Sequence, residues 1–306
     1  MNNIAIIGSG SFGCALAQKL SDKNNVKIWS YTQEETDMIN NNHKCMFLDV
    51  DLDQSIKCYT SYEDAIKDTN YIFLVVPSKV FRETCKQIKP YIRTQEIIIA
   101  TKGIENDILL SDIVKEELNV IPSLITGPSH AEQLVKEVPT FIEYTGNKSI
   151  KDIIETDNFK LYYNDDIVGM QVGASLKNVI SLIEGLIEGL GYKSNTISYA
   201  ITEGLKEIKE IGLKMGAKES TFYGLSGLGD LLTTTLSLDS RNKRCGLLLA
   251  KGKNIEEIKK EIGMTIEGLD ALNSACYLIN KYNLDCPLIS KMYDIVYNNK
   301  NINEII

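Results

Sequence analysis

The sequence is poor in positive charge relative to negative charge. Its 306 residues include 33 lysines and arginines against 41 acidic residues, which gives a net charge of −8 at pH 7. Nucleic acid and anionic membrane surfaces repel a chain of that charge, so we exclude both as general partners. An anionic small molecule would need a local cluster of cations to bind this chain.

The sequence also has no closely paired cysteines, only two histidines and no long apolar run. The seven cysteines form no C-x-x-C pair, so we expect free thiols in a reducing cytosol. No apolar run approaches the ~20 residues that cross a bilayer, and no signal peptide precedes the first strand pattern. Because the two histidines lie in no His, Cys and carboxylate ligand set, no metal site is predicted. We therefore expect a cytoplasmic protein without a transmembrane segment.

The first 20 residues contain the most informative motif that is present. An apolar run at 3–7 is followed at once by Gly8-Ser9-Gly10-Ser11-Phe12-Gly13 and then by a helical pattern at 14–20. In a dinucleotide-binding turn the first glycine permits the tight bend, the second lets a pyrophosphate approach, and the third lets helix and strand pack closely. The pyrophosphate then lies on free N–H groups at the helix N-terminus. The order of elements predicts a Rossmann site; a glycine-rich turn without a ligand is the alternative.

Strand and helix patterns alternate up to about residue 165. Further strands are predicted at 26–29, 71–76, 97–100 and 123–126, with weaker ones at 140–144 and 160–163, whereas 43–54 has the composition of a loop. Helices are predicted at 34–41, 79–88, 108–118 and 130–137. This alternation is typical of a mostly parallel sheet, which binds ligands outside the carboxyl ends of its strands. Gly10, Pro77, Lys102 and Gly127 all fall at such ends.

Helical periodicity replaces the alternation after residue 165. Helices are predicted at 168–186, 195–215, 242–250, 254–262, 267–282 and 287–298. We therefore predict an α/β Rossmann-type domain with a mostly parallel sheet at 1–165 and an all-α domain at 166–306. A length of 306 residues and 43% hydrophobic content fit two soluble globular domains.

Two lysines are candidates for chemistry. Lys102 follows a central strand, and Lys177 lies among small residues at 173–175 that let another backbone or a ligand approach. Desolvation or a second cation would lower the pKa of such a lysine toward the acid–base range. The alternatives are a solvated loop lysine for Lys102 and a solvated residue on an amphipathic helix for Lys177.

Two further positions could serve these lysines or an anionic substrate. Asp230 could orient a lysine ammonium, or it could instead be a helix N-cap. The segment 239–244 has the sequence Asp-Ser-Arg-Asn-Lys-Arg and is the strongest candidate anion site. Its Arg241 offers a planar fork that suits phosphate, although a solvated basic patch is the alternative.

Taken together, these stretches resemble the bacterial NAD(P)-dependent glycerol-3-phosphate dehydrogenases. The similar stretches occur in the family's order over nearly the whole chain. They are 8–17, Val75-Val76-Pro77-Ser78, Ala100-Thr101-Lys102-Gly103, Gly127-Pro128-Ser129-His130-Ala131-Glu132, 173–178, 224–235, Ser240-Arg241-Asn242 and Thr265-Ile266-Glu267-Gly268.

The resemblance implies a role for each matching residue. Lys177 would donate and accept the proton, and Lys102 would touch both substrate and cofactor. The remaining substrate contacts implied are Gly127, Ser129, Asp230, Ser240, Arg241 and Asn242. The remaining cofactor contacts implied are Gly8, Gly10, Ser11, Phe12, Gly13, Tyr31, Thr32, Ala131, Arg241, Thr265 and Glu267. The implied reaction reduces dihydroxyacetone phosphate to sn-glycerol 3-phosphate for glycerophospholipid synthesis, and the implied assembly is a homodimer.

The end of the second predicted strand determines the choice of cofactor. Positions 30–33 are Ser-Tyr-Thr-Gln, with no acid before Glu34 and no arginine, where the family usually has histidine or arginine. An acid there selects NAD, and an arginine selects NADP. Because the four side chains are neutral, we expect dual specificity for NAD or NADP, with a slight tolerance for NADPH.

Two other functions remain open at the level of sequence. One is a related two-domain hydroxy-acid dehydrogenase, against which the phosphate-binding character of Ser240-Arg241-Asn242 argues. The other is a catalytically silent NAD(H)-binding regulator, against which the two lysines argue.

Overall fold

The computed structural model describes residues 1–237 and 240–306. Contacts divide the chain into two compact units, one of residues 1–102 with 110–165 and one of 103–109 with 166–306. Each unit is built around its own hydrophobic cluster. The segment 103–109 belongs to the second unit although the chain enters and leaves it through the first.

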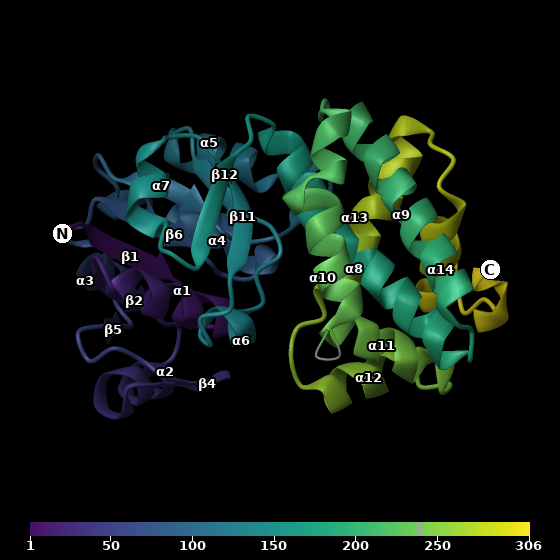
Figure 1. The fold of residues 1–306 in the computed structure, drawn as a ribbon, viewed down its shortest axis with the longest axis horizontal. Helices are drawn as coiled ribbons and strands as arrows, with labels where there is room; N and C mark the ends of the chain where they lie inside the picture. The colour runs from purple at the N-terminus through teal and green to yellow at the C-terminus, as the bar shows by residue number, and fades with distance from the viewer. Residues whose placement is uncertain (238–239) are drawn as a thin grey trace. The chain divides into compact units, whose positions relative to one another are not determined.

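The first unit is built on an eight-stranded sheet (Figure 1). In spatial order the strands are β12 (Phe159–Tyr163), β11 (Thr140–Thr145), β10 (Ser123–Thr126), β7 (Glu96–Ile99), β6 (Tyr71–Leu74), β1 (Asn3–Ile7), β2 (Asn25–Trp29) and β5 (Lys57–Tyr59). All neighbours pair in parallel except β10 and β11, which are antiparallel. The prediction of a mostly parallel sheet is therefore confirmed.

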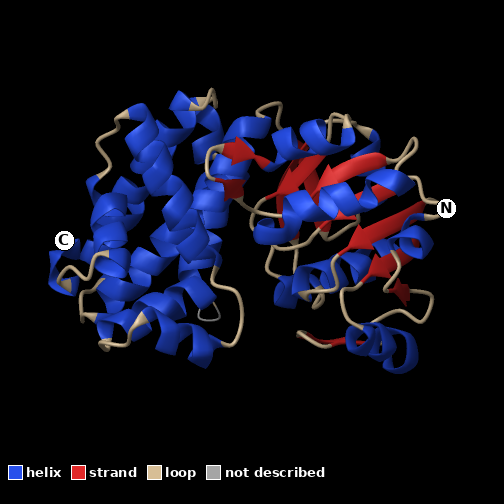
Figure 2. Cartoon of the chain, turned by 180° about the vertical axis from the view of Figure 1, so that it is seen from behind, coloured by secondary structure: helices blue, strands red, loops and turns tan. Residues whose placement is uncertain are grey.

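Helices cover both faces of this sheet (Figure 2). They are α1 (Ser11–Ser21), α2 (Gln33–Asp37), α3 (Tyr62–Ile66), α4 (Ser78–Ile88), α5 (Leu110–Leu118), α6 (Ala131–Leu134) and α7 (Ser149–Ile154). Helix α1 contacts α6 and α7, and α4 contacts α3 and α5. Ile4 and Ile6 of β1 belong to the core cluster that also contains residues of α1, α6 and α7. Because side chains alternate along a strand, Ala5 and Ile7 face the opposite side of the sheet.

Several short elements of the first unit differ from those predicted from the sequence. The loop expected at 43–54 contains a hairpin of β3 (Lys44–Cys45) and β4 (Leu48–Asp51). The helix expected at 34–41 is α2 followed by a π-helical turn at Met38–Asn42, and the helix expected at 130–137 is only α6. Strand β5 and helices α3 and α7 were not predicted, because three to six residues carry too little periodicity to recognise.

The second unit consists of helices and one small hairpin (Figure 2). The helices are α8 (Ile167–Gly189), α9 (Ser194–Lys214), α10 (Asp230–Leu236), α11 (Arg241–Ala250), α12 (Ile255–Ile262), α13 (Glu267–Tyr282) and α14 (Pro287–Tyr297), and the hairpin is β8 (Ile104–Glu105) with β9 (Ile108–Leu109). No strand occurs among the described residues of 166–306, as the all-α prediction requires.

Helix α8 is the centre of the second unit. It contacts α9, α10, α11 and α13, and it is buried around nearly its whole circumference. Glycines allow its closest neighbour to approach. A Cβ on Gly246 of α11 would lie 2.1 Å from the Leu182 carbonyl oxygen, and one on Gly185 would lie 2.1 Å from the Lys243 carbonyl oxygen. These two glycines therefore let α11 pack directly against the backbone of α8.

Within the described residues, no helix is long and apolar enough to cross a membrane.

Candidate active site

The glycine turn at 8–13 has the geometry of a dinucleotide cradle. Gly8 has φ +127°, and a Cβ there would lie 2.9 Å from the Val75 carbonyl oxygen. A Cβ on Gly13 would lie 2.0 Å from the Gly8 carbonyl oxygen, so this glycine is required for the close contact of α1 with the turn. A Cβ on Gly10 would meet no atom of the described residues within 4 Å. The space that Gly10 leaves is the opening through which a pyrophosphate would approach the backbone.

The N-terminus of α1 completes this cradle. Gly10 occupies the N-cap and, as a glycine, has no side chain that could make a capping hydrogen bond. An uncapped helix N-terminus presents free N–H groups and the positive end of the helix dipole to an anion. The residues present therefore fit a dinucleotide.

The other side chains of the first unit that are predicted to contact the cofactor differ in their exposure and in the hydrogen bonds that they already make. Ser11 donates its hydroxyl hydrogen bond to the Phe47 carbonyl at 2.9 Å, which ties the β3–β4 hairpin to α1, and Phe12 is half-buried. Ala131 is buried at the start of α6. Tyr31 is exposed, whereas the Thr32 hydroxyl accepts a hydrogen bond from Glu35 N at 3.2 Å as the N-cap of α2.

The structure corrects one premise about the end of β2. Glu35, on α2, folds back so that its Oε2 accepts a hydrogen bond from the Ser30 hydroxyl at 2.6 Å and another from the Ser9 hydroxyl. An acid therefore stands beside the glycine turn, although positions 30–33 are neutral. The sequence did not predict this contact, because Glu35 lies several positions beyond β2 and only the first turn of α2 brings its side chain back to the end of the strand.

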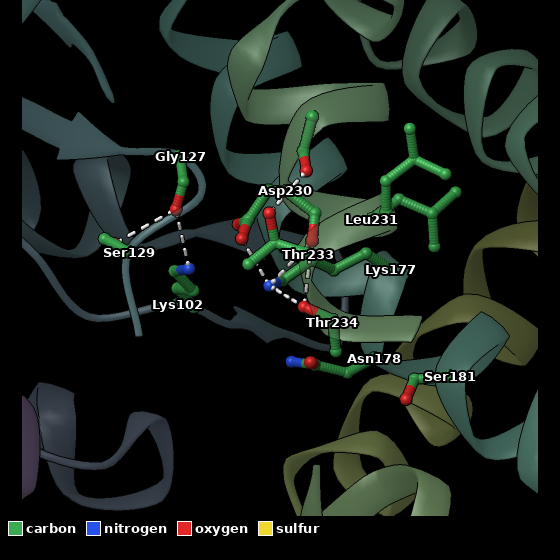
Figure 3. Close-up of polar contacts among 12 residues, drawn as sticks. Lys102, Gly127, Ser129, Lys177, Asn178, Ser181, Asp230, Leu231, Thr233 and Thr234 are labelled. Atoms are coloured by element: carbon green, nitrogen blue, oxygen red, sulfur yellow. Dashed lines mark hydrogen bonds and ion pairs between the residues drawn. The ribbon is translucent and has the colours of Figure 1, made fainter. Parts of the chain in front are cut away.

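A second polar group of the first unit surrounds the Gly127 carbonyl (Figure 3). Lys102 donates to this oxygen at 3.3 Å, and the Ser129 hydroxyl donates to it at 3.0 Å. Gly127 has φ +143°, and a Cβ there would lie 3.0 Å from Ile142 Cα, so only glycine fits where β10 runs beside β11. The carboxyl ends of β7 and β10 thus bring together three residues that the sequence predicted for the substrate.

Lys177 is at the centre of the polar cluster in the second unit (Figure 3). Its ammonium lies 2.5 Å from Asp230 Oδ1 and 2.5 Å from the Thr234 hydroxyl. Lys177 is only 5% exposed and Asp230 only 1%, so neither alternative for them, a solvated lysine or a helix N-cap, describes this pair. Asp230 begins α10, whose N-cap is Gly229. The carboxylate offsets much of the penalty of burying the ammonium.

Gly173 allows the segment that leads into α10 to pack close to Lys177. A Cβ at Gly173 would lie 2.8 Å from the Ser226 carbonyl oxygen, one turn along α8 from Lys177. The segment Leu225–Gly229 therefore packs directly on the backbone of α8 and delivers Asp230 and Thr234 to the lysine. The expectation that small residues let another backbone approach is confirmed.

Of the three cations in the segment 239–244, two form ion pairs with carboxylates. Lys243 is buried and lies 2.9 Å from Glu184 Oε1 and 2.8 Å from Glu188 Oε2, and Arg244 lies 3.8 Å from Glu261 Oε1. Arg241 starts α11, and no ion pair joins it to any carboxylate within residues 1–237 and 240–306. Asp239, which opens the segment, lies outside the described residues.

The Lys243 group has perturbed pKa values. Burial raises the pKa of the Glu184 carboxyl to about 7, although Lys243 opposes this shift. Burial also opposes the charge of Lys243, but its two carboxylate neighbours outweigh that effect and raise its pKa above the ordinary value. Glu184 Oε2 is buried and has no hydrogen-bond partner in the described part of the chain.

Ser240 and Asn242 make hydrogen bonds that connect separate elements of the second unit. The Ser240 hydroxyl caps α11 by accepting from Lys243 N at 3.3 Å, and it also lies 3.0 Å from the Ser181 hydroxyl. The Asn242 amide donates to Asn178 Oδ1 at 3.0 Å and accepts from Gly268 N at 2.9 Å. These bonds link α11 to α8 and to the start of α13.

The last two predicted cofactor residues lie at the start of α13. Glu267 begins this helix and accepts a hydrogen bond from the Asn178 amide at 3.2 Å, and Thr265 is exposed just before it. Sequence reasoning did not single out Asn178, Ser181 or Thr234. Only the similar stretches 173–178 and 224–235 marked the first and last of these, and nothing in the local pattern marked Ser181.

Comparison with known proteins gives a consistent result. The model described as the N-terminus of NAD-dependent glycerol-3-phosphate dehydrogenase matches residues 3–149, and the model described as its C-terminus matches residues 166–306. The glycerol-3-phosphate dehydrogenase (NAD(P)+) of Fusobacterium nucleatum is 38% identical over 320 residues, which cover 100% of this chain and 96% of the relative. The enzyme of the same name from Clostridium botulinum strain Eklund 17B is 38% identical and covers 98% of this chain and 94% of its own length.

Solved structures agree with these relatives. The crystal structure of glycerol-3-phosphate dehydrogenase from Coxiella burnetii superposes with a TM-score of 0.95 at 31% identity, over 99% of this chain and 97% of that one. The two family models together match most of the chain, and the relatives align along nearly its full length. The chain therefore belongs to the NAD-dependent glycerol-3-phosphate dehydrogenase family.

Proposed function

We propose that this chain is an NAD(P)-dependent sn-glycerol-3-phosphate dehydrogenase, which interconverts dihydroxyacetone phosphate and sn-glycerol 3-phosphate. The observation that carries the proposal is the buried ammonium of Lys177, held by Asp230 and Thr234. A buried, oriented proton donor is what reduction of a carbonyl requires. A protein that only binds NAD(H) has no use for it.

The first unit would hold the cofactor and polarise the substrate. The turn at Gly8, Gly10 and Gly13 and the uncapped N-terminus of α1 would bind the pyrophosphate. When bound, NAD(P)H supplies the hydride for the carbonyl carbon. Lys102, which already donates to the Gly127 carbonyl, would stabilise negative charge on the substrate oxygen, and Ser129 would donate a further hydrogen bond.

The second unit would supply the proton and bind the phosphate. As the carbonyl oxygen gains charge, the Lys177 ammonium transfers a proton to it and becomes neutral; in the reverse direction the amine takes that proton back. Arg241 would pair with the phosphate, beside the N–H groups that begin α11. Ser240 and Asn242 would hold this helix start in place through Ser181, Asn178 and Gly268.

The cellular setting follows from the same assignment. We propose that the enzyme acts in the cytoplasm, that its product feeds glycerophospholipid synthesis, and that two copies form a homodimer. Light scattering on the purified full chain tests the assembly, because a mass of about one chain would exclude the dimer. The mass of one chain is 34.2 kDa.

The test of the proton donor is Lys177→Met. Absorbance at 340 nm with dihydroxyacetone phosphate should show kcat lowered by roughly 10²- to 10⁴-fold, the usual contribution of a positioned acid. NADH affinity should stay near the wild-type value, because the glycine turn is untouched. Retention of more than about a tenth of the activity would remove Lys177 from this role.

Two further variants make that result interpretable. Lys206→Met changes an exposed lysine of the same unit and should leave kcat unchanged. Lys177→Met leaves Asp230 buried without its partner, which destabilises a fold by about 3–5 kcal/mol. The double variant Lys177→Met with Asp230→Asn removes both charges, so it should fold more stably than Lys177→Met and remain equally inactive.

A further inference from the structure

Three side chains form a small polar cluster where β1, β2 and α2 meet. Ser9 lies between the first two glycines of the turn, Ser30 follows β2, and Glu35 lies on α2. The two hydroxyl oxygens are 2.9 Å apart, and both reach the same carboxylate oxygen, Oε2 of Glu35. Ser9 is 6% exposed and Ser30 is fully buried, so the carboxylate is held from the protein side by buried donors.

The backbone fixes this cluster in place. Gly8 N donates to the Trp29 carbonyl at 3.1 Å, and Ser30 N donates to the Tyr59 carbonyl at 2.9 Å, which joins the turn to β2 and β5. Thr32 caps α2 by accepting from the N–H of Glu35 itself. Glu35 therefore has little freedom to leave the turn, and its other oxygen, Oε1, accepts no hydrogen bond from any described residue.

This is the region of a Rossmann fold where the adenosine ribose lies. An acid about 20 residues beyond the glycine turn accepts a hydrogen bond from the ribose 2′-hydroxyl in NAD-binding folds. Glu35 follows the turn by roughly that interval. It comes from the first helical turn after β2, whereas the side chains directly after the strand are neutral.

The charge of the cluster discriminates between the two cofactors. A 2′-hydroxyl can donate to the free oxygen of Glu35, whereas a 2′-phosphate would bring a dianion against a carboxylate. Among residues 1–237 and 240–306, no lysine or arginine forms an ion pair with Glu35 that would offset this repulsion. Lys27, the nearest cation along the chain, instead donates to the carbonyls of Asp64 and Lys67.

We propose that Glu35, held by Ser9 and Ser30, reads the 2′ position of the cofactor and makes the enzyme prefer NADH to NADPH. The proposal rests on the proposed function and deepens it, since it names the residue that chooses within NAD(P). It replaces the expectation of a slight tolerance for NADPH, which considered only positions 30–33.

Calorimetric titration of the full chain with ADP-ribose and 2′-phospho-ADP-ribose tests this directly. These ligands differ only in the 2′-phosphate and carry no nicotinamide, so the measurement is independent of turnover. The wild type should bind ADP-ribose about 30- to 1,000-fold more tightly, as expected for juxtaposed like charges. Equal binding, or tighter binding of the phosphorylated ligand, would overturn the proposal.

Two matched variants locate the effect. Glu35→Gln keeps the size of the side chain and removes its charge, so the ratio of the two dissociation constants should fall below about 10. Glu34→Gln changes the exposed neighbour and should leave the ratio at its wild-type value. An unchanged ratio in Glu35→Gln would also overturn the proposal.

Steady-state kinetics separate this proposal from the proposed function. The ratio of kcat/KM for NADH to that for NADPH should fall in Glu35→Gln by the same factor as the binding ratio. If the wild type discriminates between the two fragments but does not reduce dihydroxyacetone phosphate, the proposed function fails and the role of Glu35 stands. If it reduces the substrate without discriminating, the role of Glu35 fails alone.

Discussion

At the scale of single residues, the same side chain has different uses according to its partners. Lys177 and Lys243 are both buried lysines of the second unit, and both face carboxylates. Lys177 contacts one carboxylate and a threonine hydroxyl, whereas Lys243 lies between two glutamates and also donates to the Thr235 carbonyl at 3.4 Å. We propose that the first arrangement orients an ammonium for chemistry, whereas the second joins α11 to α8 and to α10.

The proposed contact of Arg241 with the substrate phosphate can be tested by substitution, with Arg244 on the same helix as a control. Arg241→Ala should weaken the use of dihydroxyacetone phosphate by about 2–4 kcal/mol in kcat/KM, because a charge-assisted contact with phosphate is lost. The loss should shrink with dihydroxyacetone, which has no phosphate. Steady-state kinetics with both substrates measure the difference.

Arg244→Ala is the matched control for this change. Arg244 lies on the same helix, is exposed and pairs with Glu261, so its removal should alter neither substrate. An equal loss for both substrates in Arg241→Ala would assign that guanidinium to the cofactor instead.

At the scale of elements, the glycine turn illustrates two opposite reasons for having no side chain. Gly13 lets α1 pack against the turn, because any Cβ would collide with the Gly8 carbonyl. Gly10 leaves open space and has φ −67° and ψ 178°, an extended conformation that any residue can adopt. Gly13 therefore serves the fold, and we propose that Gly10 serves the ligand.

This difference predicts opposite behaviour for two small substitutions. Gly10→Val should keep the wild-type unfolding free energy within about 1 kcal/mol and weaken NADH binding by at least roughly 100-fold, because it fills the pyrophosphate approach. Gly13→Ala should lower the unfolding free energy by about 1–3 kcal/mol through overpacking. Chemical denaturation and calorimetric titration separate the two effects. A Gly10→Val variant that binds NADH normally would contradict the assignment of the cradle.

At the scale of the whole molecule, stability and function are divided between two units that each have a core. The residues of the first unit predicted to contact the cofactor lie in turns and helix starts that follow strands, whereas Lys177, the proposed proton donor of the second unit, is buried in a helix bundle. Burying polar groups in a bundle makes its stability depend on pH wherever burial shifts a pKa. Glu184 is the clearest case.

The raised pKa of Glu184 gives a definite pH window. Between about pH 4.5, where an unfolded glutamate ionises, and about pH 7, the folded state binds more protons, so stability falls as pH rises. The lowered pKa of Glu188 acts only below about pH 4.5. The unfolding free energy of the wild type should therefore drop by about 1–3 kcal/mol more from pH 5 to pH 8 than that of Glu184→Gln.

Guanidinium unfolding followed by far-ultraviolet circular dichroism measures this difference, because helices dominate the signal. Glu203→Gln changes a more exposed glutamate of the same unit and should keep the wild-type slope with pH. If Glu184→Gln also keeps that slope, the proton uptake belongs to another group.

Patterns in the amino-acid sequence are sufficient to predict features that repeat or that follow one another in a fixed order. Periodicity over ten or more residues located the long helices such as α8 and α13, and the order of strand, glycine pattern and helix predicted the turn between β1 and α1. Short elements such as α7 and β5 escaped, because a few residues leave no period to detect. The family resemblance rested on the order of several stretches and was confirmed by the comparisons.

Which distant side chains meet depends on how the elements pack in three dimensions. Asp230 lies 53 residues beyond Lys177, and the two come together because Gly173 lets another segment pack on α8. Glu35 follows Ser9 by 26 residues, yet both serve one carboxylate cluster because β1 and β2 are neighbours in the sheet. Patterns along a chain record local preference, whereas contacts between distant residues depend on how elements pack, and packing is fixed only when the whole unit has folded.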